Sequence, residues 1–426
     1  MKHWIAAALA AFPAVAGAQE LDGGDTAWIL TSTALVLFMT LPGLALFYGG
    51  LVRTKNVLSV LMQCFAITCA ISVMWVLFLY SLAFAEGGPL IGGLGKAFFA
   101  GVEEGTVSGT IPETAFAMFQ LTFAIITPAL VVGGFAERMK FSAMLTFSML
   151  WSILVYAPVC HWVWAADGWL FGMGLLDFAG GTVVHITAGV AALVAALVLG
   201  TRQGFPSTPM LPHNMTMTVT GAAMLWVGWF GFNGGSALAA NGNAAMAILV
   251  THISAAAGAA AWAIIEWFRY GKPSALGTVT GMVAGLGTIT PASGFVGPGG
   301  ALVIGLAAGV LCFNATNFLK RKLGVDDSLD VFPVHGVGGI LGTLLAGVFA
   351  SSALGVFSGQ GYADGMNMGS QMGVQAIGVL AVGTYTAAVT FVLLKLVRMV
   401  MGLRVSAEEE SSGLDTAQHN ERGYDL

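Results

Sequence analysis

Charged residues are scarce in this chain of 426 residues: Asp, Glu, Lys and Arg make up 9% of it, whereas 57% is hydrophobic. A soluble domain carries about 25% charged residues to cover its water-facing surface. The composition therefore excludes a soluble enzyme, a disordered protein and a nucleic-acid-binding protein. Glycine, by contrast, is abundant at 59 residues, and small residues let membrane helices approach closely. We predict a polytopic membrane protein.

Cysteine is also scarce, and its pattern disfavours two kinds of site. Cys64, Cys69, Cys160 and Cys312 all fall within apolar stretches and form no CxxC pair or zinc-ligand spacing. We interpret them as small core residues. Because the sequence also offers no activated nucleophile, we expect neither an enzyme nor a bound cofactor.

The N-terminal segment MKHWIAAALAAFPAVAGAQE has the features of a secretory signal peptide. Lys2 precedes an apolar run, and the small residues at 16–18 form a cleavage site before Gln19. The run is shorter than the ~20 residues that an uncleaved span needs. We therefore assign residues 1–18 to a signal peptide, whose removal places the mature N-terminus outside the cytoplasm.

Eleven apolar segments after residue 26 are long enough to cross a bilayer. They lie near 27–50, 56–84, 112–136, 141–164, 178–200, 214–236, 242–268, 274–291, 298–319, 330–352 and 370–402. We predict an all-α transmembrane domain over residues 19–402, followed by a tail over residues 403–426.

The basic residues between these segments predict the orientation. Lys and Arg clusters follow the odd-numbered segments, at Arg53/Lys55, Arg138/Lys140, Arg202, Arg269/Lys272 and 320–322. The other loops contain Lys96 as their single basic residue. The positive-inside rule then places the odd connections and the tail in the cytoplasm. We expect a multi-pass protein of the cell inner membrane with a periplasmic N-terminus.

The number of segments also suggests an internal repeat. Five segments precede the loop TRQGFPSTPMLPH and five follow it before the last one. Because five is odd, the two halves would enter the membrane in opposite senses, as in an inverted repeat with a substrate path at the midplane. DFAGGTVVHITAG in the fifth segment and DVFPVHGVGG in the tenth each place a His shortly after an Asp. We predict a five-plus-five inverted repeat and a final helix.

Ionisable residues inside apolar spans cost about 2.5–3.5 kcal/mol each to insert and are functional candidates. His185 lies eight residues after Asp177, and His335 lies five residues after Asp330. Since these segments enter from opposite faces, both histidines should approach the membrane centre and form a pair. The alternative is two separate packing histidines. A metal site is less favoured, because no third ligand has suitable spacing.

Three other ionisable residues have structural interpretations. Asp177 suits the first turn of a helix, where a carboxylate caps free amides, and it could also attract cations. We interpret His252 as a core or lumen-facing polar residue, and His161 as an interfacial packing residue.

Aromatic residues gather near the outer ends of three segments. Phe119 and Phe123 lie in the third segment, Trp164 ends the fourth, and Phe232 and Ser236 end the sixth. Aromatic faces attract cations by about 0.5–2 kcal/mol, and Ser236 could accept a hydrogen bond. Each aromatic alone could belong to an interfacial belt, but their convergence above the histidine pair favours a site for a cation.

Six motifs follow one another along the chain. They are PGLALFYGGLVRTKNVLS (42–59), FAERMKFS (135–142), DFAGGTVVHITAG (177–189), GWFGFNGGSA (228–237), VDDSLDVFPVHGVGGI (325–340) and GLRV (402–405). In this order they closely resemble the motifs of the ammonium transporters of the Amt/Mep/Rh family, especially the bacterial Amt branch. The resemblance covers essentially the whole mature chain, and it implies the ammonium transporter fold and a homotrimer with one pore in each subunit.

The resemblance also implies roles for individual residues. The outer ammonium-recruitment site would comprise Phe119, Trp164, Ser236 and the essential acid Asp177. Phe123 and Phe232 would form the gate of the pore. His185, His335 and Gln120 would line the pore.

Ammonium resembles potassium in size and charge, but it can lose its proton, and desolvation favours the neutral amine. We therefore predict a channel that recruits ammonium or its analogue methylammonium, deprotonates it and conducts ammonia past the histidines, supplying nitrogen for assimilation. The alternatives are an ammonium sensor, a neutral gas channel for carbon dioxide or ammonia, and a sodium-coupled transporter. The midplane histidines and the Phe gate disfavour the last of these.

The polar tail GLRVSAEEESSGLDTAQHNERGYDL has two interpretations. It is a solvated end, as many termini are, or it packs beneath the trimer and helps a cytosolic PII-type signalling protein to plug the pores, as the family resemblance implies.

Overall fold

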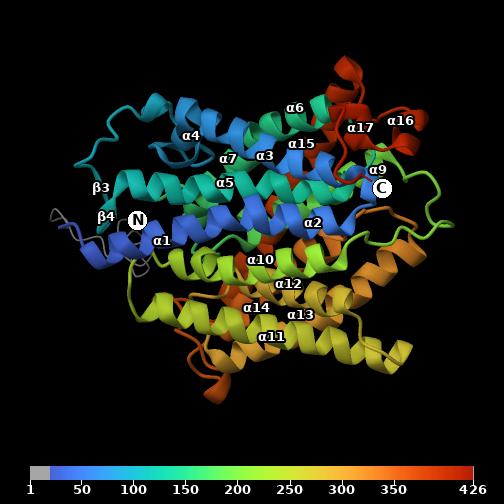
Figure 1. The fold of residues 1–426 in the computed structure, drawn as a ribbon. Helices are drawn as coiled ribbons and strands as arrows, with labels where there is room; N and C mark the ends of the chain where they lie inside the picture. Colours follow the sequence, from blue (N-terminus) through green and yellow to red (C-terminus); the bar gives the residue numbers. More distant parts are fainter. Residues whose placement is uncertain (1–19, 426) are drawn as a thin grey trace.

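The computed structural model describes residues 20–425, so the predicted signal peptide lies outside the described residues. Membrane-length helices run side by side along one direction (Figure 1). The helices of the first half are α1 (Gly23–Phe38), η2 (Met39–Leu44), α2 (Ala45–Leu51), η3 (Thr54–Asn56), α3 (Val57–Met74), η4 (Trp75–Leu79), α4 (Tyr80–Phe84), η5 (Ala97–Phe99), α5 (Glu113–Phe135), α6 (Phe141–Trp151), η6 (Ser152–Tyr156), α7 (Ala157–Trp164), α8 (Trp169–Gly172), η7 (Gly181–Ile186) and α9 (Thr187–Leu199).

The second half repeats this arrangement of long helices. It contains α10 (Met215–Gly235), α11 (Gly242–Tyr270), α12 (Ala275–Ile289), α13 (Pro298–Asn317), η8 (Phe318–Lys322), η9 (Phe332–Gly336), α14 (Val337–Phe349), η10 (Gly355–Phe357) and α15 (Met368–Met401), and the tail forms α16 (Ala407–Ser412) and α17 (Leu414–His419). Every predicted segment is helical. Consecutive α-helical and π-helical elements join into continuous helices, and among the described residues ten of these are long and apolar enough to cross a bilayer. The eleventh, α12, is a shorter apolar helix. The predicted eleven-helix architecture is confirmed.

The two ends of the bundle differ. Two short antiparallel hairpins, β1 (Gly87–Gly88) with β2 (Ile91–Gly92) and β3 (Val107–Ser108) with β4 (Ile111–Pro112), lie at the end where α1 begins (Figure 1). The tail helices α16 and α17 lie at the opposite end. Following the loop charges, we call the hairpin end the outer end and the tail end the cytoplasmic end.

Small residues bring the helices of the second half into backbone contact. A Cβ atom on Gly258 of α11 would lie 2.4 Å from the carbonyl oxygen of Gly281 on α12. A Cβ on Gly305 of α13 would lie 2.4 Å from the carbonyl oxygen of Ser254. No side chain fits at these distances, so the glycines are what allow α11, α12 and α13 to pack so closely.

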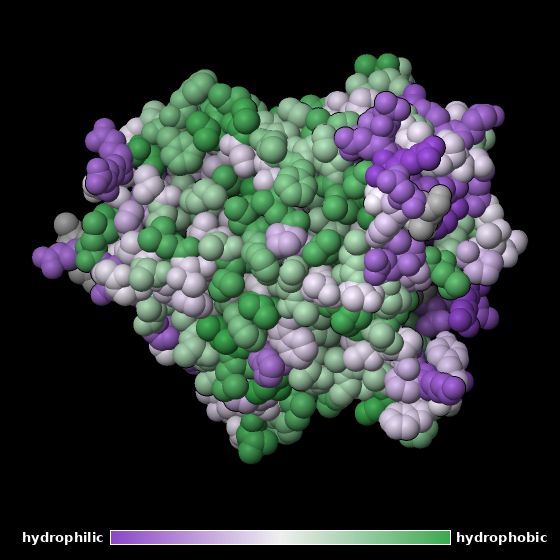
Figure 2. All heavy atoms as spheres, viewed as in Figure 1, coloured by the Kyte–Doolittle hydropathy of each residue, from purple (hydrophilic) through white to green (hydrophobic). Residues whose placement is uncertain are grey.

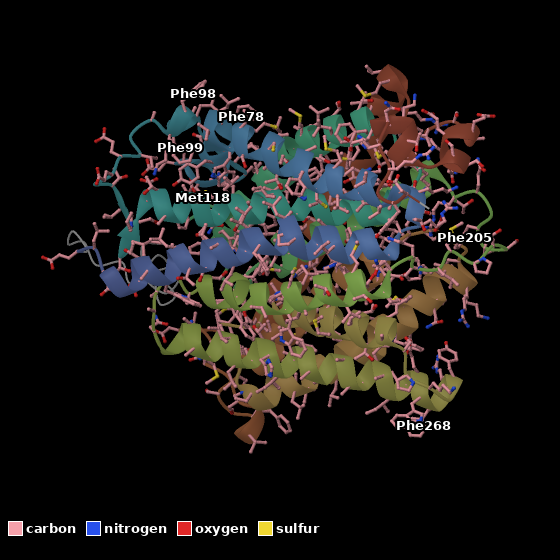
Figure 3. The ribbon with its side chains drawn as sticks, in the orientation of Figure 1. Phe78, Phe98, Phe99, Met118, Phe205 and Phe268 are labelled. Atoms are coloured by element: carbon pink, nitrogen blue, oxygen red, sulfur yellow. The ribbon has the colours of Figure 1, made fainter. Side chains whose placement is uncertain are left out.

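On the face shown in Figure 2 the middle of the bundle is mostly apolar, and hydrophilic residues gather over the tail. Exposed aromatic side chains mark both ends: Phe98 at the outer end is 73% exposed and Phe268 at the cytoplasmic end is 88% exposed (Figure 3). Aromatic residues at both borders of an apolar band are typical of a membrane-spanning protein.

Two predictions about individual residues are wrong. Both concern which side of a helix faces outward. Cys69 is exposed, whereas the other three cysteines are buried. His252 is exposed on α11 rather than directed into the core or a lumen, and its ring lies 5.2 Å from that of Trp226.

Candidate functional site: the histidine pair and the aromatic cluster

His185 and His335 meet inside the bundle. The Nδ1 atoms of the two rings are 3.1 Å apart, and the rings are stacked with centroids 5.1 Å apart. They are 1% and 4% exposed. A hydrogen bond between two Nδ1 atoms requires that one ring donates while the other accepts. The structure therefore brings the two histidines together, as their positions in the sequence predicted.

Each histidine lies on a π-helical turn at the start of its span. His185 lies on η7 and His335 on η9. A π-helical turn widens the backbone, leaves the regular i→i−4 hydrogen-bond pattern, and is frequent at functional sites. Both turns continue into regular helices, α9 and α14, which fix the direction in which the rings point.

An aspartate caps each π-helical turn. The carboxylate of Asp177 accepts hydrogen bonds from the backbone amides of residues 180–183 and from the hydroxyl of Thr182. In the second half, the Asp327 carboxylate accepts the backbone amide of Phe332 at 2.7 Å. Capping amides with a carboxylate also complements the positive end of a helix.

Asp327, not Asp330, therefore occupies the position in the second half that Asp177 occupies in the first. The expectation that Asp330 is the equivalent of Asp177 is wrong. Asp330 instead forms an ion pair with Lys320 at 2.8 Å. The correct spacing is visible in the sequence, because Asp177 precedes His185 and Asp327 precedes His335 by the same number of residues. This equivalence supports the inverted repeat.

The hydrogen bonds of Asp177 and Asp327 predict different effects on stability and transport when each aspartate is replaced with asparagine. Both oxygens of Asp177 accept N–H groups, so the NH₂ group of Asp177→Asn would face donors in either orientation. One oxygen of Asp327 has no partner among the described residues, and burial, with the charge of Asp330, raises the pKa of Asp327 to about 7. We expect Asp177→Asn to destabilise the protein by about 1–3 kcal/mol and to lose methylammonium uptake. Asp327→Asn should change stability by less than about 0.5 kcal/mol.

Thermal unfolding in detergent and uptake by cells that make each variant would measure both effects. Asp327→Ala is the control that removes the second cap altogether. Near-normal uptake and stability in Asp177→Asn would contradict this interpretation of its hydrogen bonds.

A continuous set of aromatic contacts leads from the outer end to the histidine pair. The ring of Phe119 lies 5.0 Å from that of Phe123, which lies 5.6 Å from Trp164 and 4.3 Å from Phe232. Phe232 in turn lies 6.2 Å from His185. The predicted aromatic residues from α5, α7 and α10 therefore form one cluster directly beside the histidines.

Polar atoms flank this cluster. The indole of Trp164 donates to the carbonyl oxygen of Asp177 at 3.0 Å. The hydroxyl of Ser236 donates to the carbonyl oxygen of Phe232 at 2.8 Å, which leaves its oxygen free to accept a hydrogen bond. Gln120 is buried on α5, and its side-chain oxygen has no partner among the described residues.

A narrow cavity of about 10 Å³ adjoins both histidines, and it has room for the centre of about one water-sized molecule. Phe232 and Trp229 also line it, and its remaining lining is apolar. The walls thus offer imidazole edges to a small polar molecule and no charged group. A hydrated ion would have to lose its water here, which is costly without compensating ligands.

Sequence reasoning missed Trp229. Its indole is stacked on His185 with centroids 5.6 Å apart and donates to the hydroxyl of Thr290 at 2.9 Å. The residue lies one helical turn from Phe232 in GWFGFNGGSA, so helical spacing from the gate residue could have identified it.

Comparison with known proteins identifies the family. A model of the Ammonium Transporter Family matches residues 27–424. The chain belongs to this family. It is 48% identical over 405 residues to an ammonium transporter of Bacillus subtilis, covering 94% of this chain and 98% of that protein. It is 43% identical to the ammonium transporter Amt1 of Archaeoglobus fulgidus over 95% of this chain and all of that one. This protein is therefore an ammonium transporter and not an enzyme.

Solved structures share the fold of this ammonium transporter. The crystal structure of Saccharomyces cerevisiae Mep2 superposes with a TM-score of 0.84 at 38% identity, covering 92% of this chain and 89% of that chain. A structure titled as a sensor Amt protein has a TM-score of 0.85 at 30% identity, covering 93% and 98%.

The cytoplasmic end of the transporter contains a buried network of charges. Glu137 forms ion pairs with Arg53 at 2.8 Å and with Arg202 at 3.1 Å, and Arg202 also binds Asp326 at 2.7 Å. Burial alone would raise the pKa of Glu137 and of Asp326, but the neighbouring arginines hold both pKa values below their usual range. The network joins the loops after the first, third, fifth and ninth spans.

The tail of the transporter is packed against this end, so the interpretation as a simply solvated end is wrong. Asp415 accepts the amides of Leu58 and Ser59 at the start of α3, at 3.0 and 2.7 Å. Glu410 binds Arg404 and the backbone amide of Gln203, both at 2.7 Å. The tail therefore joins the start of α3 to the loop that connects the two halves.

Proposed function

We propose that this transporter recruits ammonium at its outer end, removes a proton, and conducts ammonia past the histidine pair. Phe119, Trp164 and Ser236 would bind the cation, with Asp177 beside them. Aromatic faces and a hydroxyl oxygen are suitable groups for ammonium, because they attract a cation without holding it as tightly as a carboxylate would.

Phe123 and Phe232 would form the gate. Their rings lie 4.3 Å apart, in van der Waals contact, so a hydrated cation cannot pass unless they move. The observation that best supports conduction of ammonia is the stacked, buried His185–His335 pair in a cavity that is otherwise apolar. Desolvation favours the uncharged amine, and the imidazole edges can donate to or accept from it.

Reconstituted vesicles would test this proposal. Ammonium, methylammonium, potassium and carbon dioxide are offered in turn, and uptake and current are recorded for each. We expect ammonium and methylammonium to be transported and potassium to be excluded. Carbon dioxide flux without ammonium transport would instead indicate a neutral gas channel.

We also propose a homotrimer. His252 lies ten residues into α11, about 15 Å along the helix from its outer end, and it is exposed there. A polar ring facing lipid near the membrane centre is unfavourable, whereas a neighbouring subunit would cover it. A side-by-side interface that includes α10 and α11 would bury His252, Trp226 and Phe230 together.

The orientation gives a further prediction. We propose a signal peptide over residues 1–18, a transmembrane domain over 19–402 and a cytoplasmic tail over 403–426, in the inner membrane. A reporter that is active only in the cytoplasm should be active when fused after residue 426, and inactive when inserted between residues 103 and 104. The reverse pattern would contradict the orientation.

The tail gives another prediction. We propose that a cytosolic PII-type protein binds the cytoplasmic end and closes the pore, with the tail contributing to its binding surface. Deletion of residues 406–426 removes the Asp415 cap of α3 and the Glu410 contacts. We expect it to reduce methylammonium uptake or to abolish its inhibition when nitrogen becomes abundant. Unchanged uptake and unchanged inhibition would show that the tail has no such role.

A sensor is the second candidate function. The solved structure titled as a sensor Amt protein shares the fold, and the packed tail of this chain could report occupancy of the pore to a partner. Transport by the purified protein in vesicles, together with normal nitrogen-dependent gene expression in cells that carry a transport-inactive variant, would argue against a sensor.

A further inference from the structure

His161 lies at the outer end of α7 and is fully buried. Its Nδ1 lies 3.0 Å from the carbonyl oxygen of Ala83, and its Nε2 lies 2.8 Å from the carbonyl oxygen of Gly88. A carboxylate oxygen of Asp167 lies 3.4 Å from Nε2. The partners of both ring nitrogens are thus hydrogen-bond acceptors.

This arrangement suits a charged ring. A neutral imidazole has one N–H group and one lone pair, whereas an imidazolium has two N–H groups. A neutral His161 would direct its lone pair at a carbonyl oxygen, that of Ala83 or that of Gly88, whichever tautomer it adopted. The imidazolium satisfies both carbonyl groups, and Asp167 supplies the opposite charge.

The contacts of His161 join α7 to the outer hairpin at residues 87–92. Asp167 also accepts the backbone amide of Gly87 at 2.9 Å. The indole of Trp162 donates to the carbonyl oxygen of Leu90 at 2.7 Å. The hairpin is therefore attached to the end of α7 by a few hydrogen bonds. His161 provides one of them, to Gly88, and its other ring nitrogen holds Ala83 at the end of α4.

We propose that His161 is held as an imidazolium and is a positioning residue for the outer site. Its hydrogen bonds to Ala83 on α4 and to Gly88 in the hairpin, which we call the clamp, hold both elements against α7 and so set the position of Trp164. Trp164 follows His161 by one helical turn, and its indole contacts Phe123 and Asp177. This inference rests on the proposed recruitment role of Trp164.

The clamp should depend on pH. Among the other titratable groups on elements packed against α7, Asp177 is engaged by the amides of η7, His185 is bonded to His335, and Tyr80 on α4 donates to Glu113. Tyr156 lies in η6, and Glu86 is exposed before the hairpin. Asp167 is thus the acidic group in contact with the ring. A ring with a single N–H group would leave one of the two carbonyl oxygens without a donor, so we expect the clamp to weaken at alkaline pH.

Hydrogen exchange of the wild-type transporter in lipid nanodiscs tests the clamp directly. Backbone amides of residues 83–93 are followed from pH 5 to pH 9, with correction for the intrinsic exchange rates. We expect protection to fall roughly tenfold toward the alkaline end, as expected for the loss of a charge-assisted hydrogen bond. A pH-independent protection factor would overturn the proposal without any variant.

Two variants test the positioning role. His161→Gln and Asp167→Asn should remove the pH dependence of exchange and raise the KM for methylammonium roughly tenfold, with a smaller effect on the maximal rate. His213→Gln, at the cytoplasmic end, is the matched control and should keep the wild-type pH profile of exchange. If His161→Gln keeps the wild-type profile or the wild-type KM, the proposal is wrong. If Trp164→Ala also leaves the KM unchanged, the recruitment role itself fails.

Discussion

Replacing either member of the histidine pair with alanine should lower the rate of ammonium transport roughly tenfold, while the protein still folds and assembles. The physical reason is that each ring orients the other through the 3.1 Å Nδ1–Nδ1 contact. Loss of one ring leaves the other with a buried, unpaired nitrogen, at a cost of about 1–3 kcal/mol, and each 1.36 kcal/mol added to a barrier is tenfold in rate. Uptake and current in vesicles, compared for ammonium, methylammonium and potassium, would measure the effect.

An acidic substitution should act in the opposite way on selectivity. His185→Glu or His335→Glu places a potential negative charge in the narrow apolar cavity, which would compensate a desolvated cation and admit potassium. His213→Gln, which changes a histidine at the cytoplasmic end and outside the pore, is the matched control for rate and selectivity. The proposed mechanism is wrong if His185→Ala and His335→Ala both match the wild type in rate and in preference for ammonium over potassium.

The largest effect on stability should come from Arg202→Ala. Arg202 is 6% exposed and pairs with the fully buried carboxylates of Glu137 and Asp326. Breaking a buried pair by removing one partner typically costs about 3–5 kcal/mol, because the remaining charge has no compensation. Thermal unfolding in detergent should detect the loss. Arg321→Ala is the control, since Arg321 is exposed, and it should change stability by less than about 0.5 kcal/mol.

The same network predicts how stability depends on pH. The pKa values of Glu137 and Asp326 are lowered in the folded protein, so their contribution is present above the ordinary carboxyl value of about 4. It is lost as the pH falls through the lowered values. We expect Arg202→Ala to flatten this acid-dependent part of the stability profile. A variant with the wild-type profile would show that the arginine does not stabilise the two carboxylates.

Hydropathy and loop charges predicted most of this fold, because a segment that crosses a bilayer must be both apolar and long. The histidine pair was predictable too, since an ionisable residue inside a span needs a partner, and the two halves supply equivalent positions. The aromatic cluster followed from residues at similar depth in different spans.

The errors about exposure have a common physical origin. A helix surrounded by lipid on one side and protein on the other is apolar all round, so hydropathy does not show which side His252 or Cys69 faces. The expectation that Asp330 is the equivalent of Asp177 followed from its place at the start of the motif of the tenth segment, although the equal spacing to the histidines indicates Asp327. For the tail the sequence left two interpretations open, because its contacts are polar and the segments that it binds are distant in sequence.

The short helix α12 has a consequence for how this protein is made. Its 15 residues extend about 22 Å, less than the ~30 Å apolar core of a bilayer, and residues 290–295 continue its path as turns. Non-helical backbone at that depth must find its hydrogen bonds within the protein. The carbonyl oxygen of Pro291 receives the amide of Phe178, and that of Phe295 receives the amide of Gln360. One partner precedes this segment in the chain and the other follows it. We therefore expect residues 290–295 to complete their backbone hydrogen bonds only once residue 360 has been synthesised, so that the final position of α12 depends on chain that is made after it.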